Sequence, residues 1–189
     1  MTSLPGKVAV ITGATSGIGA RVAELFVSEG TRQAPDGLPA VRQHHQHGQH
    51  GGKAAGWSGL DYSTAKAAVI HLTRCAAVDL AQHAVRVNSV SPGFVPTGIF
   101  AKGGGLDPSM ADTTAEKLAA GTTTLTAGVQ PIEEIVTTDD VAAAVLWFAS
   151  DASRLVTGQD IGVDGGVSAG RPLSALWTDR TRIRETLTS

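Results

Sequence analysis

Residues 1–30 combine three features that together restrict the fold. Residues 7–11, Lys-Val-Ala-Val-Ile, form a short apolar, β-branched run, typical of a strand buried on both faces of a parallel sheet. A glycine-rich turn follows at 13–19, and residues 20–29 then show helical spacing, with Gly30 as a helix-ending residue. A strand, a tight turn and a helix in this order predict an α/β fold around a parallel sheet.

Similar elements return in the second half of the chain. Helical spacing begins again near Ser58, and a strand is expected at 85–90. A helix is expected from Thr138 to Ser150, because Thr138 and the two acidic residues after it suit a helix start, and a last strand at 159–163. Residues 94–136 are expected to form a mobile loop over a cleft. We expect one domain over residues 1–189, with 170–189 as a C-terminal extension.

Composition excludes several classes of function. The net charge of −2 gives no basic surface for nucleic acid or an anionic membrane. Cys75 is the only cysteine, so neither an intrachain disulfide nor a cysteine cluster for zinc can form. No apolar run reaches the length of a signal peptide core or a membrane span. The chain is therefore expected to be a soluble, cytoplasmic protein.

The turn after the first expected strand suits a phosphate group. Small residues let the backbone turn sharply and approach a pyrophosphate, and the N-terminus of the next helix offers free N–H groups. Thr15 and Ser16 add hydroxyl donors. The candidate cofactor residues of this turn are Gly13, Thr15, Ser16, Gly17, Ile18 and Gly19. The alternative is an ordinary glycine-rich turn between a strand and a helix.

Tyr62 and Lys66 are candidates for acid–base chemistry. They stand four residues apart in an expected helix, so their side chains share one face. An ammonium group beside a phenol favours the phenolate and moves its pKa toward a useful range. The alternative is a surface tyrosine beside a solvated lysine.

Four motifs follow one another in a recognisable order: Thr12-Gly13-Ala14-Thr15-Ser16-Gly17-Ile18-Gly19, Tyr62-Ser63-Thr64-Ala65-Lys66, Asn88-Ser89-Val90-Ser91-Pro92-Gly93 and Asp164-Gly165-Gly166. Over about residues 4–30 and 57–170 the chain resembles the short-chain dehydrogenase/reductases. That resemblance implies an α/β fold with a Rossmann-like, doubly wound parallel sheet. It also implies an enzyme that uses NAD or NADP to interconvert a secondary alcohol and a ketone.

The resemblance also implies roles for individual residues. Tyr62 would pass the proton to or from the substrate oxygen, and Lys66 would bond the nicotinamide ribose. Both residues are therefore also expected to take part in cofactor binding. The stretch that contains Pro92, Gly93, Val95 and Thr97 would contact the nicotinamide carboxamide and a nearby phosphate, or would simply be a turn that ends a strand. The substrate would be a small alcohol or ketone, and the folded protein a homo-oligomer. Asn88 is expected to be structural.

Residues 31–56 are too few to complete such a sheet. The family order of strands is 3-2-1-4-5-6-7, and the chain offers candidates for strands 1, 6 and 7 only. Three absent βα units would need about 30 residues each, whereas this segment holds 26 residues without a strand or helix period. We expect an irregular His/Gly-rich insert here and an incomplete sheet without strands 2–5. The open strand edges would then pair in a new way, or the sheet would not close.

Several residues of this region bear on the cofactor, on catalysis and on metal binding. Asp36 lies near the count for a ribose ligand, but proline before it argues against a strand, so NAD and NADP both remain open. The expected active-site serine position holds Gln49, and Ser58 is only one helical turn before Tyr62. We predict no metal site, because the run that contains His44, His45, His47 and His50 has no nearby carboxylates.

Two hypotheses follow for the whole chain. The first is an NAD(P)-dependent oxidoreductase in which Tyr62 is the acid–base group. The second is a non-catalytic remnant of that fold that acts as a binding or oligomerisation module. The motifs favour the first, and the missing strands and serine favour the second.

Overall fold

The structure, a computed structural model, describes residues 3–7, 9, 11, 14, 16–31, 52–54, 56, 58–97, 117 and 126–188, and the backbone alone at 45–47. The chain falls into two compact units. Unit 1 comprises Met1–Pro92 and Thr137–Val163, and unit 2 comprises Gly93–Val136 and Asp164–Ser189. Each unit is assembled from two separate stretches of the chain. The single domain over 1–189 stays a prediction.

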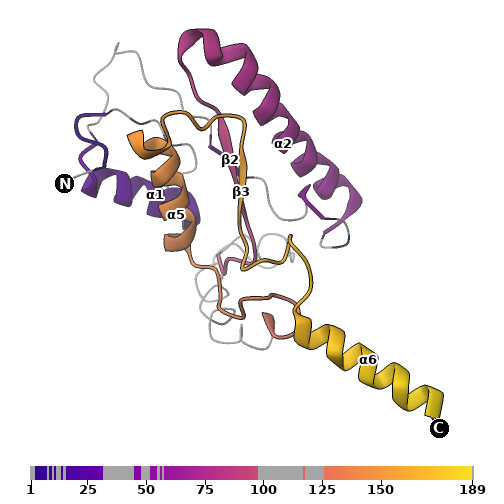
Figure 1. The fold of residues 1–189 in the computed structure, drawn as a ribbon. Helices are drawn as coiled ribbons and strands as arrows, with labels where there is room; N and C mark the ends of the chain where they lie inside the picture. Colours follow the sequence, from indigo (N-terminus) through magenta and orange to yellow (C-terminus); the bar gives the residue numbers. More distant parts are fainter. Residues whose placement is uncertain are drawn as a thin grey trace. The chain divides into compact units, whose positions relative to one another are not determined.

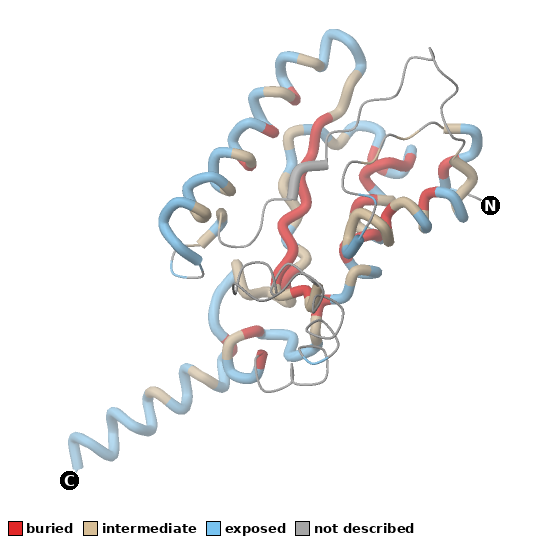
Figure 2. The backbone as a smooth tube through the Cα atoms, turned by 180° about the vertical axis from the view of Figure 1, so that it is seen from behind, coloured by how far each residue is buried: buried red, intermediate tan, exposed pale blue. Residues whose placement is uncertain are grey.

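Unit 1 contains a parallel sheet with the strand order β1-β2-β3. Strand β2 (Asn88–Pro92) lies between β1 (His45–His47) and β3 (Asp160–Val163). All five residues of β2 are buried (Figure 2), as expected for a central parallel strand. The register places Ser89 opposite Gln46 on one side and Asp160 on the other. The predicted incomplete parallel α/β fold is confirmed.

Three long helices surround this sheet in unit 1. Helix α2 (Leu60–Leu80) contacts β1 and β2, and helix α5 (Thr138–Ala149) contacts β2 and β3. Helix α1 (Gly17–Ser28) packs on α5, so that α2 lies on one side of the sheet and α1 with α5 on the other (Figure 1). Short 3₁₀ turns follow α2 at Ala81–His83 and α5 at Asp151–Ser153.

The apolar faces of α1 and α5 form a large part of the core of unit 1. Helix α1 buries Val22 and Phe26. Helix α5 buries five side chains, including Phe148. A capping box starts α5: the hydroxyl of Thr137 accepts from the N–H of Asp140, whose carboxylate accepts from the N–H of Thr137. Thr137, one residue before the predicted Thr138, is therefore the N-cap.

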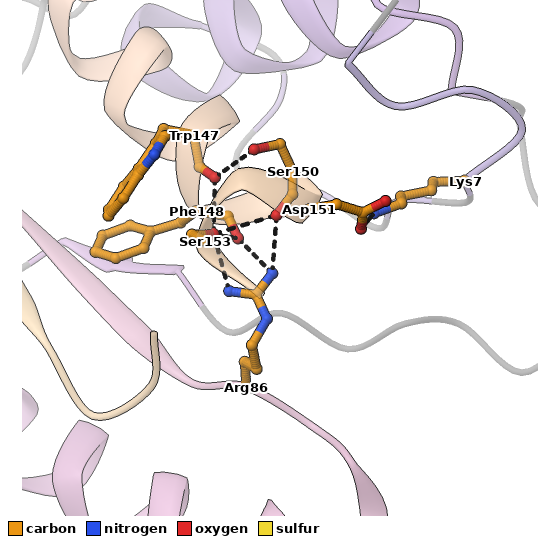
Figure 3. Close-up of polar contacts among 7 residues, drawn as sticks. All are labelled: Lys7, Arg86, Trp147, Phe148, Ser150, Asp151 and Ser153. Atoms are coloured by element: carbon orange, nitrogen blue, oxygen red, sulfur yellow. Dashed lines mark hydrogen bonds and ion pairs between the residues drawn. The ribbon is translucent and has the colours of Figure 1, made fainter. Parts of the chain in front are cut away.

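Arg86, just before β2, ties α5 to the sheet (Figure 3). Its guanidinium donates to the carbonyl of Phe148 at 2.7 Å and that of Ser150 at 3.4 Å, at the end of α5. It also donates to Ser153 Oγ at 3.1 Å and to the carbonyl of Val156 at 3.3 Å. A cation at a helix C-terminus stabilises the last, otherwise unpaired carbonyls. This network fixes α5 and the turn after it on β2.

One prediction about the sheet is wrong, and a second falls mostly on residues outside the described ranges. The described members of the expected first strand, Lys7, Ala9 and Ile11, lie in no strand. The insert at 31–56, expected to be irregular, contains β1, which pairs with the edge of β2 where the resemblance places the fifth strand. Backbone N–H and C=O groups at an open edge need partners whatever the side-chain pattern, so an unpatterned segment can still supply a strand. At the edge of β2, the new pairing is the alternative that is found.

Unit 2 contains the Asp164-Gly165-Gly166 turn and the C-terminal helix. The buried carboxylate of Asp164 accepts from the N–H of Gly166 at 2.9 Å and that of Ser168 at 3.0 Å, which closes the turn. Helix α6 (Leu173–Thr188) forms most of the predicted C-terminal extension and has no buried residue. None of the helices in the described ranges has the length and apolar character needed to cross a bilayer.

Candidate active site

Helix α2 brings Tyr62 and Lys66 together, as their four-residue spacing predicts. The same face buries Ile70, Thr73 and Ala77, so it is the face packed on the sheet. Tyr62 and Lys66 stand near the start of this face and are half-buried. The Lys66 Nζ atom lies over the Tyr62 ring, 5.3 Å from its centroid, a cation–π distance. An acid–base group and a cation therefore share one partly solvent-accessible face.

The pKa directions at this pair differ from the sequence-based expectation. Burial raises the pKa of the Tyr62 phenol above its ordinary value, and burial lowers the pKa of the Lys66 ammonium. Removal from water disfavours the charged form of each group. The ammonium faces the ring, so its field does not offset the burial of the phenol. The protein alone therefore holds Tyr62 as a neutral phenol at neutral pH.

We expect Tyr62 to ionise at a higher pH in the folded protein than after unfolding. Tyr62 is the only tyrosine, so near-ultraviolet phenolate absorbance reports this group alone. The unfolded chain should show a midpoint near pH 10, and the native protein a higher one. Because the folded pKa lies above the unfolded one, this group's stabilising contribution is lost as the pH rises through that window.

Equal midpoints in native protein and in concentrated urea would contradict the burial of the Tyr62 phenol. The Tyr62→Phe chain is the control, because it should show no phenolate signal in either state.

The candidate phosphate turn lies partly within the described residues. Gly17, Ile18 and Gly19 form the first turn of α1, and Ser16 is its N-cap. Ser16 is exposed and extended, and its side chain makes no capping hydrogen bond. Among the described residues, its hydroxyl caps no N–H group of the first turn, and such a helix start suits an anion. Gly13 and Thr15 lie outside the described residues.

The third group of predicted residues is divided between the units. Pro92 ends β2 in unit 1, whereas Gly93, Val95 and Thr97 belong to unit 2. Val95 is buried and Thr97 is half-buried. A Cβ on Gly93 would stand 2.8 Å from the Asp164 Cα atom, so only glycine fits beside the Asp164 turn. The pair that the structure brings into contact is thus Tyr62 and Lys66.

Other sequence-based candidates have mixed outcomes. Asn88 is structural, as predicted: it donates to the carbonyl of Val156 at 2.9 Å and accepts from the N–H of Gln159 at 3.1 Å. The Ser58 hydroxyl lies 2.9 Å from that of Ser63 at the start of α2. Asp36 and Gln49 lie outside the described residues.

The predicted absence of a metal site also concerns residues that lie partly outside the described ranges. Within the ranges that the structure describes, no three His, Cys, Asp or Glu side chains gather as metal ligands would. His44 and His50, and the side chains of His45 and His47, lie outside these ranges. The predicted lack of a metal site stays a prediction.

A polar cluster that sequence reasoning missed lies between β2 and β3. Asp160 accepts hydrogen bonds from Ser89 and Ser91 and pairs with Lys53. It borders a groove of about 670 Å³, which is also lined by Ile70, His71 and Arg74 of α2. The available signal was Ser89 in the strand expected at 85–90 and Ser91 two residues later, because polar groups on one face of a buried strand need partners on a neighbouring strand.

Comparison with known proteins identifies relatives for the part of the chain that contains α2, β2, α5 and β3. Residues 48–168 match the family model described as enoyl-(acyl carrier protein) reductase. Cis-4-hydroxycyclohexanecarboxylate dehydrogenase of Sinomonas cyclohexanicum is 39% identical over 108 residues, which are 57% of this chain and 37% of that protein. Momilactone A synthase of Oryza sativa is 40% identical over 107 residues, 57% of this chain and 36% of that protein. The matched segment thus spans well under half of these curated relatives.

Solved structures show the same likeness. A short-chain dehydrogenase/reductase family oxidoreductase from Burkholderia thailandensis has a TM-score of 0.55 and 30% identity, over 70% of this chain and 46% of that one. Ligand-free aldohexose dehydrogenase of Thermoplasma acidophilum has a TM-score of 0.68 at 21% identity, over 91% of this chain and 98% of that one. The second likeness shows the fold alone. The fold is thus Rossmann-like, as predicted.

Proposed function

Because the chain belongs to the short-chain dehydrogenase/reductase family, we propose that it is an NAD- or NADP-dependent oxidoreductase for a secondary alcohol and the corresponding ketone. The contact between Lys66 and Tyr62 on α2 is the observation that carries this proposal. It places a proton donor and a fixed cation on one half-buried helix face. Dehydrogenase relatives such as the Sinomonas enzyme support the reaction class.

In the proposed mechanism, Tyr62 Oη donates a proton to the substrate oxygen during reduction and accepts one during oxidation. The nicotinamide, when bound, accepts or supplies the hydride. The positive charge of its oxidised form and of Lys66 would lower the pKa of Tyr62, against the effect of burial. Lys66 would also bond the nicotinamide ribose.

The residues present fit a dinucleotide at α1. Four successive backbone positions, 16–19, form a helix start whose N-cap hydroxyl is not used for capping. Free N–H groups at a helix N-terminus suit a pyrophosphate. We assign Gly13, Thr15, Ser16, Gly17, Ile18 and Gly19 to the phosphates, and Pro92, Gly93, Val95 and Thr97 to the nicotinamide end. Both NAD and NADP are compatible with these residues.

A second candidate function is a non-catalytic binding or oligomerisation module. The outer face of α2 leaves Leu60 86%, Leu72 53% and Val78 77% exposed. Exposed large apolar side chains on one helix suit contact with a second copy of the chain. The chain's short match to its relatives is consistent with this alternative, in which the motifs would be inherited without turnover.

Titration with NADH and with NADPH, followed by nicotinamide fluorescence, tests the proposed function. Saturable binding of one of them by folded protein is expected. A Ser16→Ala, Gly19→Val double variant is the matched control, because it removes a hydroxyl donor and blocks close approach of the phosphates. No saturable signal from wild-type protein that circular dichroism shows to be folded would favour the non-catalytic module.

A further inference from the structure

Lys53 makes an ion pair with the buried side chain of Asp160. The Lys53 Nζ atom lies 2.8 Å from Asp160 Oδ2, and the side chains are 24% and 5% exposed. Lys53 Nζ also donates to the Asp160 carbonyl at 3.4 Å. A carboxylate so shielded from water is costly without a cation beside it, so this pair stays closed more firmly than a surface pair.

Asp160 is itself held in place by the neighbouring strand. The hydroxyl of Ser89 donates to Asp160 Oδ1 at 2.6 Å, and that of Ser91 donates to the same oxygen at 2.8 Å. Both serines are fully buried in β2, and Ser89 stands opposite Asp160 in the register. Asp160 therefore offers Lys53 an anchor that is fixed to the centre of the sheet.

The residue before Lys53 touches the backbone of the candidate catalytic lysine. A Cβ on Gly52 would stand 2.7 Å from the carbonyl carbon of Lys66 and 2.9 Å from the nitrogen of Ala67. Glycine is therefore required where the 52–54 turn meets α2. The turn rests on α2 on one side and is anchored to β3 on the other through Lys53.

We propose that Lys53 is a positioning residue whose ion pair with Asp160 holds the Gly52 turn against α2 and so fixes the place of Lys66. Lys66 and Tyr62 are one helical turn apart, so the same contact sets the position of both. The inference rests on the proposed function only for the role of Lys66. Lys53 itself contacts neither Tyr62 nor a reacting atom.

Hydrogen exchange of the full-length protein tests directly whether the Lys53–Asp160 ion pair holds the Gly52 turn against α2; this arrangement is called the clamp below. In a Lys53→Met chain, amides 63–67 of α2 should exchange about tenfold faster than in the wild type, because local opening of this turn becomes easier. Amides of α5 should be accelerated much less, because the loss of the pair acts first on the turn against α2 and reaches α5 only through overall stability. Lys53→Arg keeps a cation within reach of Asp160 and should restore slow exchange. Lys7→Met is the matched control, since it removes a different lysine–aspartate pair of unit 1, the one with Asp151.

The phenolate titration of Tyr62 gives a second readout. Tyr62 is one helical turn from Lys66, so we expect loosening of α2 at Lys66 to expose the phenol as well. Its midpoint should then fall toward the unfolded value in Lys53→Met and stay high in Lys53→Arg and Lys7→Met. Two results would overturn the positioning role. One is wild-type exchange and titration in Lys53→Met, and the other is equal acceleration in α2 and α5, which would show a general loss of stability.

The clamp and the proposed function fail in different ways. Wild-type protein that binds no nicotinamide nucleotide contradicts the proposed function, but the local exchange pattern of Lys53→Met still decides on the clamp. Where nucleotide does bind, Lys53→Met should weaken its affinity about fivefold or more through a misplaced Lys66, and Lys53→Arg should bind as the wild type does.

Discussion

A Tyr62→Phe chain is expected to lose reductase activity by about 10²–10⁴-fold, the usual contribution of a positioned acid–base group. Phenylalanine keeps the ring over which the Lys66 Nζ atom lies, so helix packing and the cation–π contact remain. Only the phenolic hydroxyl, which carries the transferable proton, is removed. Nucleotide affinity should therefore stay within about twofold of the wild type, because the phosphates and the ribose are held by other groups.

The measurement is turnover of a panel of secondary alcohols and ketones together with the fluorescence titration. Lys66→Met is the comparison, because the loss of its bond to the ribose should weaken nucleotide binding as well as turnover. Unchanged turnover in Tyr62→Phe would remove Tyr62 from the mechanism. Loss of nucleotide affinity along with activity would indicate a damaged helix and not only the loss of the phenolic hydroxyl.

Local sequence pattern was sufficient for the parts of the fold and site that depend on neighbours along the chain. The four-residue spacing of Tyr62 and Lys66 predicted their contact, and the strands expected at 85–90 and 159–163 lie within a few residues of β2 and β3. The helix predicted from Thr138 to Ser150 corresponds to α5, except that its N-cap is Thr137. Each of these depends on helix or strand periodicity, which a sequence displays directly.

Features that depend on distant partners could not be predicted in the same way. Strand β1 carries no strand pattern and is defined by its pairing with the edge of β2. Asp160 and Lys53 are 107 residues apart, and only the fold makes their charges adjacent. The direction of the Tyr62 pKa was also a matter of burial, which depends on what packs around α2. The charge and spacing of Lys66 alone had predicted a lowered pKa for Tyr62.

Arg86→Met is expected to lower the free energy of unfolding of unit 1 by about 3 kcal/mol, because buried hydrogen-bond acceptors lose a charged donor. Arg86 bonds three carbonyls and the hydroxyl of Ser153. Burial lowers the pKa of its guanidinium, and the charge of Asp151 partly offsets this, so the group stays protonated at any accessible pH. Methionine has a similar apolar stem but no donor, so the variant isolates the loss of the guanidinium.

Urea unfolding followed by far-ultraviolet circular dichroism measures this effect. Arg86→Lys should fall between the wild type and Arg86→Met, because an ammonium keeps the charge near the end of α5 but cannot span the same set of acceptors. Arg154→Met is the matched control: Arg154 is exposed in the same turn, and its loss should change stability by less than about 0.5 kcal/mol. If Arg86→Met unfolded at the wild-type urea concentration, the end of α5 would be held to the sheet by apolar packing of Phe148 and not by this network.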